Sequence, residues 1–372
     1  MTFVIITHVK HKFQGQVILG YAPYVREMNI WLKHVDEVII VAPKTSEAIS
    51  DIDIAYQHKN IKFVEIPAIQ FTSLKHAFFA IFKMPKIVWA IFKASKKANH
   101  LHLRCPGNIG LFGCLVQMVF PKIPKTAKYA GNWDPKSKQP LSYRLQKRIL
   151  SNTFLTKNIQ VLVYGKWPKQ TKNIKPFFTA TFKENEIEAP LIRQYTYGLK
   201  FVFLGSLVSG KRPLLAIKIV ALLIKKGFNV SFDLYGEGIL KEELQLYIQA
   251  QGLSDHIKLL GNRDKNVVKE ALKEAHFLLL PSKSEGWPKA LAEAMFFGAI
   301  PISTTISCVP YMLDEGNRGI LISPDEKSAA NKIESLLNTP TELQEMSKLA
   351  YKWSQNYTLN TFEAEIVKLL QV

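Results

Sequence analysis

Two glutamates eight positions apart, Glu285 and Glu293, stand where a buried strand leads into a helix. Glu285 lies in the loop and Glu293 in the second helical turn, where both carboxylates can face one ligand. The free N–H groups of the first turn and the positive end of the helix dipole form a seat for a phosphate group. This combination suits a sugar, a diphosphate and a ribose. The alternative is structural, because any glutamate near a helix start gains about 0.3–1 kcal/mol from the dipole.

The residues around Glu285 carry a family pattern. Glu285 is followed by Gly286, Trp287 and Pro288, and the small-residue helix that contains Glu293 ends at Gly298. This pattern resembles the signature of glycosyltransferase family 4, which comprises retaining, nucleotide-sugar-dependent enzymes of the GT-B fold. The resemblance covers residues 200–325 well and the amino-terminal half only at the level of fold.

The resemblance implies roles for the matching residues. Glu285 would hold hydroxyls of the donor sugar, Glu293 would hold the ribose, and Lys211 would contact the donor diphosphate. Ser206 stands where the family usually carries an arginine, and Arg212 either replaces that arginine or is a solvated charge. The residues expected to bind the donor are Gly205, Ser206, Lys211, Arg212, Gly236, Gly238, Asn262, Arg263, Ser282, Glu285, Gly286, Trp287, Pro288 and Glu293.

Weaker signals lie in the amino-terminal half. Gly15 belongs to a loop expected near donor and acceptor, or to an ordinary βα loop. His102 and Arg104 share one face of a strand by alternation, and Arg104 is expected to project into the cleft on the acceptor side. His102 is a third candidate catalytic residue beside Glu285 and Lys211, or else a hydrogen-bonded core histidine. Asn132 and Asp134 close another strand and are expected to contact the acceptor, unless Asp134 caps a helix.

Alternating strands and amphipathic helices must position these residues, a pattern typical of parallel sheets covered on both faces. In the second half we expect strands at 201–204, 230–235, 257–260, 277–280, 300–303 and 319–322, and helices at 213–226, 239–251, 264–275, 288–298 and 309–314. In the first half we expect strands at 3–7, 38–41, 63–66, 101–104, 127–130 and 161–164, and helices at 18–33, 71–83, 86–98, 109–119 and 140–152.

These elements predict an α/β protein with two doubly wound, Rossmann-like domains facing across a cleft. The polar segment 172–197 contains two prolines and is the expected linker. We assign residues 1–180 to an acceptor-side domain, 181–355 to a nucleotide-sugar-binding domain, and 356–372 to a helix that returns to the first domain.

The charge is concentrated in one third of the chain, which carries a net charge of +19. Residues 66–183 hold 21 basic side chains and one acid, Asp134, whereas the two flanking segments are nearly neutral. Within 71–104, Phe71, Phe78, Phe79, Phe82, Trp89 and Phe92 alternate with Lys75, Lys83, Lys86, Lys93, Lys96 and Lys97. This composition suits an anionic membrane interface, or else the aromatic groups pack inside the domain.

Other classes of protein and site receive less support. The apolar start, Phe3 to Ile6, is too short for a signal peptide and indicates a buried strand. No stretch approaches a membrane span. The three cysteines have neither metal nor disulfide spacing, so we expect buried thiols in a reducing cytosol. The excess of lysine without a recognised module ranks nucleic acid below a membrane as the partner.

The sequence therefore predicts a retaining glycosyltransferase that uses a nucleoside-diphosphate sugar and a hydroxyl acceptor. The acceptor is expected to be lipid-linked or a nascent cell-surface polysaccharide or glycolipid, and the protein to be peripheral on the cytoplasmic face of the cell membrane. The resemblance implies no obligatory metal, and the sequence shows no Asp-x-Asp site. The alternatives are a sugar-nucleotide epimerase or hydrolase on the same fold, and a non-catalytic binding protein associated with a membrane or with RNA.

Overall fold

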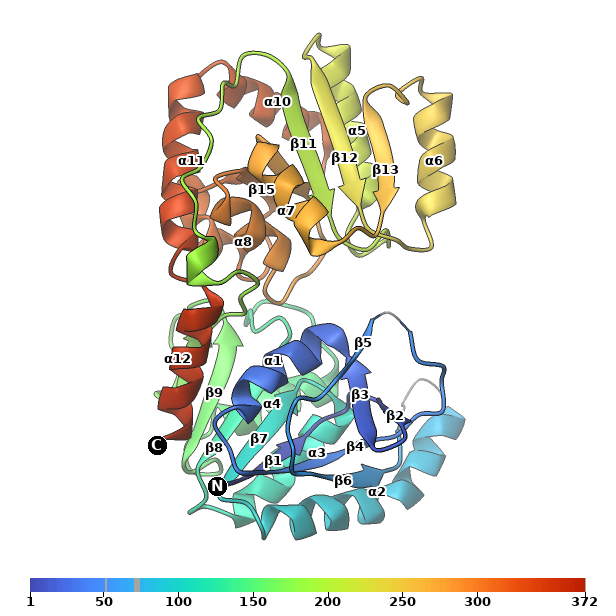
Figure 1. Cartoon of the computed structure of the whole chain (residues 1–372), viewed down its shortest axis with the longest axis vertical. Coiled ribbons are helices and arrows are strands. Elements are labelled where there is room, and N and C mark those ends of the chain that lie inside the picture. The colour runs from blue at the N-terminus through green and yellow to red at the C-terminus, as the bar shows by residue number, and fades with distance from the viewer. Residues whose placement is uncertain (51, 70–73, 372) are drawn as a thin grey trace. The chain divides into compact units, whose positions relative to one another are not determined.

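The computed structural model describes residues 1–50, 52–69 and 74–371, and the side chains of all of these except 74–80. The chain divides into two compact units (Figure 1). Unit 1 comprises residues 1–178 and 362–372, and unit 2 comprises residues 179–361. Each unit is built on a parallel sheet, which confirms the predicted α/β class with two doubly wound sheets. No helix in the described ranges has the length and hydropathy needed to cross a bilayer.

Unit 1 contains a seven-stranded sheet in which all neighbouring strands are parallel. Its five central strands are buried along almost their whole length, as expected of a parallel sheet covered on both faces. The strand order along the chain reverses between β1 and β7. In spatial order the strands are β10 (Ile174–Phe177), β9 (Ile159–Tyr164), β8 (Lys125–Tyr129), β7 (His100–Cys105), β1 (Thr2–Ile6), β4 (Glu37–Pro43) and β6 (Ile61–Ile66).

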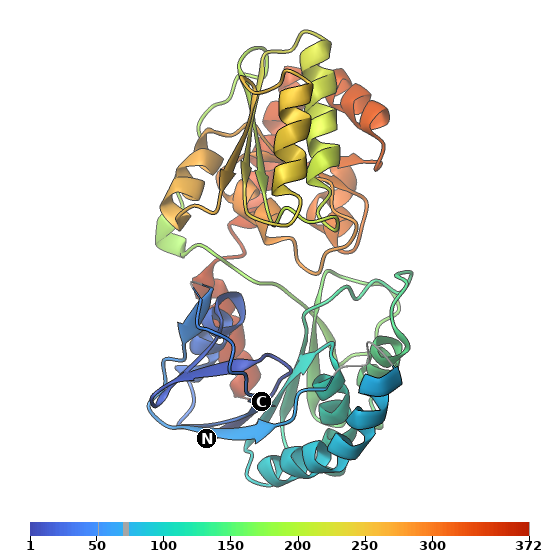
Figure 2. The ribbon, with the colours of Figure 1, turned by 90° about the vertical axis from the view of Figure 1, so that its right-hand side faces the viewer.

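Helices cover both faces of this sheet (Figure 2). One face carries α1 (Ala22–Leu32) and α12 (Leu359–Leu370). The other carries α2 (Leu74–Ser95), α3 (Asn108–Val116) with the short η1 (Gln117–Val119), and α4 (Leu141–Leu150). The ring of Phe362 in α12 packs against Phe177 and Phe178. The carboxyl-terminal helix therefore returns to the first domain, as predicted.

Two parts of unit 1 differ from the prediction. Residues 11–21, part of which we expected to begin a helix, form a hairpin of β2 (His11–Gln14) and β3 (Val17–Tyr21), which pairs with β5 (Asp53–Ala55). The two helices expected at 71–83 and 86–98 are one helix, α2, which continues through Pro85. Ile87 and Ile91 follow the proline and are fully buried, so the apolar face of the helix packs against the core beyond Pro85.

Unit 2 contains a six-stranded parallel sheet, and its elements within residues 200–325 confirm the prediction to within a few residues. The strand order reverses between β11 and β14. In spatial order the strands are β13 (Ile257–Gly261), β12 (Val230–Tyr235), β11 (Leu199–Leu204), β14 (Phe277–Leu280), β15 (Ile300–Thr304) and β16 (Ile320–Ile322).

Two layers of mutually packed helices enclose the sheet of unit 2. One layer consists of α6 (Lys241–Ala250), α5 (Pro213–Lys225) and α10 (Glu326–Leu337). The other consists of α7 (Lys265–Glu274), α8 (Lys289–Phe296) and α11 (Pro340–Ser354). Three short helices, η2 (Glu184–Glu186), α9 (Val309–Met312) and η3 (Asp314–Gly316), lie in the connections.

Candidate functional site

The strand-order reversal of unit 2 brings together the two loops that carry most of the predicted donor residues. β11 leads into residues 205–212 and β14 into residues 281–288. Ligands of open α/β sheets bind outside the carboxyl ends of the strands at such a reversal. The two loops contact each other directly, because the backbone N–H of Lys283 donates to the carbonyl of Gly210 at 2.8 Å.

An ion pair joins the two loops at this point. The ammonium of Lys211 donates to a carboxylate oxygen of Glu285 at 2.6 Å. The Glu285 side chain is only 9% exposed and that of Lys211 is 29% exposed, so the pair is partly shielded from water. The backbone N–H of Glu285 donates to the hydroxyl of Ser307 at 3.2 Å. The structure thus unites a fixed cation and a fixed carboxylate that lie far apart in the sequence.

Glycines allow the loops after β11 and β12 to pack backbone against backbone. Gly236 has a φ of +143°, and a Cβ atom there would lie 2.0 Å from the carbonyl oxygen of Gly205. A Cβ atom on Gly238 would lie 2.4 Å from the carbonyl oxygen of Leu207. The N–H of Leu207 donates to the carbonyl of Glu237 at 2.9 Å. The loop after β12 therefore supports the loop that carries Lys211.

Arg212 takes a different direction from its neighbour Lys211. Its backbone is left-handed, with φ 52° and ψ 49°, at the N-cap of α5. Its guanidinium lies 3.4 Å from the carbonyl oxygen of Ser282 and borders a hollow that Lys283 and Lys332 also line. The Ser282 side chain, predicted to bind the donor, is completely buried. The structure thus places the guanidinium of Arg212 beside Ser282, and Arg212 is not a partner in the Lys211–Glu285 ion pair.

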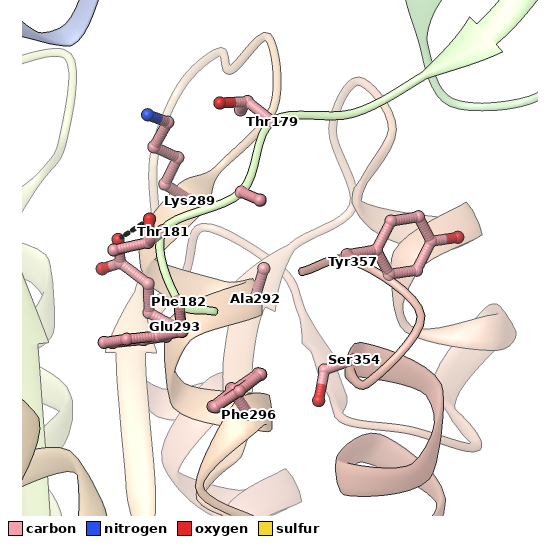
Figure 3. A pocket seen from close by; sticks show the side chains of 10 residues that line it. Thr179, Thr181, Phe182, Lys289, Ala292, Glu293, Phe296, Ser354 and Tyr357 are labelled. Atoms are coloured by element: carbon pink, nitrogen blue, oxygen red, sulfur yellow. Dashed lines mark hydrogen bonds between the residues drawn. The ribbon is translucent and has the colours of Figure 1, made fainter. Parts of the chain in front are cut away.

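Glu293 lies on α8 but takes part in a separate contact. Its carboxylate accepts a hydrogen bond of 2.6 Å from the hydroxyl of Thr181 (Figure 3). Lys289 lies one turn earlier on the same face of α8, and both residues line a hollow of about 10 Å³. That volume holds about one water molecule. The Thr181 contact engages one carboxylate oxygen of Glu293 and leaves the second available to a ligand.

Two residues of the motif after Glu285, Trp287 and Pro288, are buried in the protein interior. Trp287 is buried and packs against the rings of Trp353 and Tyr357 at 6.1 and 5.4 Å. The prediction that Trp287 contacts the donor is therefore wrong for its ring, because α11 covers it. Pro288 is the N-cap of α8 rather than its first residue.

The other predicted donor residues lie at the loop surfaces. Gly286 remains in the loop, where its carbonyl accepts from the thiol of Cys308 at 3.0 Å. Burial raises the pKa of Cys308 and keeps this thiol protonated. Ser206, Asn262 and Arg263 are exposed on the loops after β11 and β13.

Unit 1 has its own polar cluster at the carboxyl end of β7. Arg104 lies 3.9 Å from a carboxylate oxygen of Glu27 and over the ring of Tyr24 at 5.2 Å. The same oxygen lies 3.6 Å from the ammonium of Lys128. Lys128 is fully buried and donates to the carbonyl of Phe178 at 2.9 Å. Arg104 is thus held in place by a carboxylate that a second cation also neutralises.

His8 is a further candidate site residue, which the sequence analysis did not name. It follows β1 at the strand-order reversal, and a Cβ atom on Gly107 would lie 2.7 Å from its Nδ1 atom. Desolvation by the surrounding protein and the charge of Arg104 lower the pKa of His8. Its ring is therefore neutral at pH 7. The available signal was its position directly after the first strand, which is where such folds bind ligands.

His102 and Gly15 do not belong to this cluster, and the predicted catalytic role of His102 is wrong because its side chain is buried. His102 is completely buried, with its ring 4.7 Å from that of Trp31, and Nδ1 is 2.8 Å from the hydroxyl of Thr126. Desolvation holds its pKa well below the usual value. It is a core histidine, because its face of β7 points to α1. Gly15 forms the exposed turn between β2 and β3, where φ is +59°.

Asn132 and Asp134 form a compact turn after β8. The Asn132 side chain accepts from the N–H of Asp134 at 2.9 Å, and the Asp134 side chain accepts from the N–H of Lys136 at 2.8 Å. Asp134 therefore stabilises a turn and does not cap a helix. Among the described residues, no three His, Cys, Asp or Glu side chains gather as metal ligands do.

Comparison with known proteins identifies the second unit's relatives. Residues 192–353 match the family model described as "Glycosyl transferases group 1". A similar curated protein is "GalNAc-alpha-(1->4)-GalNAc-alpha-(1->3)-diNAcBac-PP-undecaprenol alpha-1,4-N-acetyl-D-galactosaminyltransferase" of Campylobacter jejuni. It is 27% identical over 172 residues, which are 45% of this chain and 47% of that enzyme. The chain spans about half the length of the curated relatives it matches.

Solved structures resemble the whole chain. Sucrose-phosphate synthase from Thermosynechococcus elongatus aligns with a TM-score of 0.67 at 16% identity, covering 100% of this chain and 98% of its own. Anabaena HepE in complex with UDP aligns with a TM-score of 0.68 at 13% identity, covering 100% and 99%. At these identities the likeness concerns the fold. The chain therefore has the GT-B fold, and its second unit is similar to the group 1 glycosyl transferases.

Proposed function

We propose that this chain is a retaining glycosyltransferase of the family 4 type, which transfers a sugar from a nucleoside-diphosphate sugar to a hydroxyl acceptor. The observation that carries the proposal is the Lys211–Glu285 ion pair at the strand-order reversal of unit 2. It lies within the segment that matches the group 1 glycosyl transferases. A cation for the diphosphate and a carboxylate for sugar hydroxyls are thereby held next to each other before any ligand arrives.

In the proposed chemistry, each of the three side chains interacts with either the charged diphosphate or hydroxyl groups of the donor. Lys211 stabilises the negative charge that develops on the leaving diphosphate, with help from the first turn of α8. Glu285 accepts hydrogen bonds from donor-sugar hydroxyls, and Glu293 binds the ribose through the oxygen that Thr181 does not engage. No side chain is assigned as a covalent nucleophile, and the proposed displacement takes place on one face of the sugar. No metal is assigned to the reaction, and EDTA is expected to leave it unchanged.

For the acceptor, we propose a lipid-linked glycan, or a nascent polysaccharide or glycolipid, bound by unit 1. Arg104 and His8 lie at the carboxyl ends of adjacent strands, where they can contact a hydroxyl or a phosphate. The name of the similar Campylobacter enzyme specifies an undecaprenol diphosphate acceptor. This relative supports an acceptor of the same chemical class.

We further propose that the protein binds to the cytoplasmic face of the cell membrane. On the outer side of α2, Ile81, Phe82 and Trp89 are 57%, 68% and 57% exposed. Lys83, Lys86 and Lys93 are exposed on the same helix. Phe92 is half-buried, Phe71 lies outside the described residues, and the side chains of Lys75, Phe78 and Phe79 are also outside the description. The described aromatic groups therefore favour an interfacial surface over a purely internal role.

The function is tested by following both the donor and the product. A panel of nucleotide sugars should yield one or a few that raise the melting temperature of the full chain. With that donor, radiolabelled sugar should move to a polyprenyl-diphosphate glycan acceptor, and NMR should show that the anomeric configuration of the donor is retained. Release of free sugar at the same rate without acceptor would identify a hydrolase, and a changed nucleotide sugar would identify an epimerase. Failure of every donor to bind would overturn the proposal.

A further inference from the structure

A second ligand-sized hollow lies in unit 1, at the edge of the sheet opposite to the proposed acceptor site. Its volume is about 590 Å³. It is lined by residues at or before the amino ends of four adjacent strands, β7 to β10, and by Leu369 of α12. The cationic and potentially cationic residues that line it are His100, Lys125, Lys157, Lys172 and Lys175.

Lys125 forms the buried part of this cationic lining. Lys125 is only 2% exposed. Its ammonium donates to the carbonyls of Phe120 and Ile123 at 2.7 and 3.0 Å. An ammonium has three hydrogens, so one donor remains beyond these two bonds. Burial lowers the pKa of Lys125 to about 8, so the ammonium form still predominates at pH 7. A charge is thus held in the protein at a cost that a bound anion would reduce.

The hollow contains no compensating negative side chain among the described residues that line it. Residues 66–183 have one acid, Asp134, and it follows the carboxyl end of β8, at the other edge of the sheet. The ammonium groups of Lys157, Lys172 and Lys175 extend from exposed residues around the same hollow. His100, whose pKa burial lowers to about 4, is neutral at pH 7 and adds a polar ring without a charge.

We propose that this hollow is a binding site for a phosphate-bearing anion, distinct from both the donor and the acceptor sites. Four lysines from separate elements can surround a tetrahedral oxyanion, with Lys125 at the bottom and the other three at the rim. Lysine suits this task as a compact point charge with freely oriented donors. The phosphate belongs either to a soluble molecule or to the headgroup of an anionic lipid.

The test uses inorganic phosphate as the probe and isothermal titration calorimetry of the full chain at low salt. The variant Lys157→Gln/Lys172→Gln/Lys175→Gln removes the rim charges without disturbing buried Lys125. We expect this variant to bind phosphate at least about tenfold more weakly than the native chain, because it has lost one or more charge-assisted hydrogen bonds to the phosphate. The matched control, Lys59→Gln/Lys136→Gln/Lys138→Gln, removes the same charge from exposed positions outside the hollow and should change the affinity less than about twofold.

Vesicles distinguish the two sources of phosphate. If the rim variant also loses binding to phosphatidylglycerol vesicles and the control does not, the ligand is a lipid headgroup; if only phosphate binding is lost, the ligand is soluble. Equal phosphate affinity in the native chain and the rim variant would overturn the proposal. So would an equal loss in the control. Failure of the donor panel would leave this result unaffected, because the donor residues all lie in unit 2.

Discussion

At the scale of single residues, two adjacent cations in the loop after β11 have different surroundings. Lys211 is paired with Glu285 at 2.6 Å, whereas Arg212 lies beside the carbonyl of Ser282 at 3.4 Å. The backbone of Arg212 is left-handed, with φ 52° and ψ 49°. Left-handed conformations of residues other than glycine cost free energy and tend to occur at functional sites. Charge alone therefore does not identify the residue that meets the diphosphate.

The first prediction separates these two cations by substitution. We expect Lys211→Ala to weaken binding of the nucleoside diphosphate of the preferred donor by about ten- to a hundredfold, because charge-assisted hydrogen bonds contribute about 1.5–3 kcal/mol. Arg212→Ala serves as the matched control and should weaken it less than about threefold, since its guanidinium lies elsewhere. Calorimetry with purified protein measures both. A larger effect at Arg212 than at Lys211 would show that Arg212 replaces the phosphate-binding arginine.

At the scale of elements, the site depends on loops whose backbones touch. The loop after β12 contacts the loop after β11 at Gly236 and Gly238, at distances that leave no room for a Cβ atom. The same contact fixes Leu207, a fully buried residue of the loop that carries Lys211. Substitution of these glycines is therefore expected to change both the stability of unit 2 and the position of the loop that carries Lys211.

The second prediction is that Gly236→Ala destabilises unit 2 by about 2–4 kcal/mol, from a steric clash and an unfavourable φ. Gly210→Ala is the matched control in the neighbouring loop: nothing lies within 4 Å of its Cβ position, so we expect a change below about 0.5 kcal/mol. Urea unfolding followed by circular dichroism measures both changes. If the two variants prove equally stable, the close approach of the two backbones is not a requirement of the fold.

Within residues 200–325 the sequence allowed the elements to be predicted because most strands and helices there have a clear apolar pattern and a glycine or proline at one end, such as Gly227 after α5 and Gly252 after α6. The hairpin of β2 and β3 was missed, since its turn at Gly15 resembles an ordinary loop between a strand and a helix. Alternation correctly put His102 on one face of β7 but could not show that α1 covers that face. Glu27 was missed because its partners, Arg104 and Lys128, come from distant strands.

At the scale of the whole molecule, the excess of positive charge and the proposed donor-binding residues belong to different units. The excess of basic side chains lies in residues 66–183, within unit 1 apart from its last few positions, while residues 184–372 carry 21 basic and 22 acidic side chains. The exposed aromatic groups of α2 belong to the same basic segment. We therefore expect unit 1 to supply the positive electrostatic field that association with an anionic surface requires.

The third prediction is that the full chain binds vesicles containing phosphatidylglycerol and not vesicles of phosphatidylcholine alone. Each lysine near such a surface contributes about 1 kcal/mol, so Lys83→Gln/Lys86→Gln/Lys93→Gln should weaken vesicle binding by about a hundredfold or more. Salt at 0.5 M shortens the screening length to about 4 Å and should weaken vesicle binding by the native chain to a similar extent. Trp89→Ala should also weaken binding, since its ring is 57% exposed on α2. Ile192→Ala, which removes an apolar side chain of a residue that is 94% exposed in unit 2, is the control and should bind as the native chain does. Flotation of the vesicles measures all of these variants. Equal binding to the two kinds of vesicle, or an equal loss in Trp89→Ala and Ile192→Ala, would show that α2 is not the membrane-binding surface.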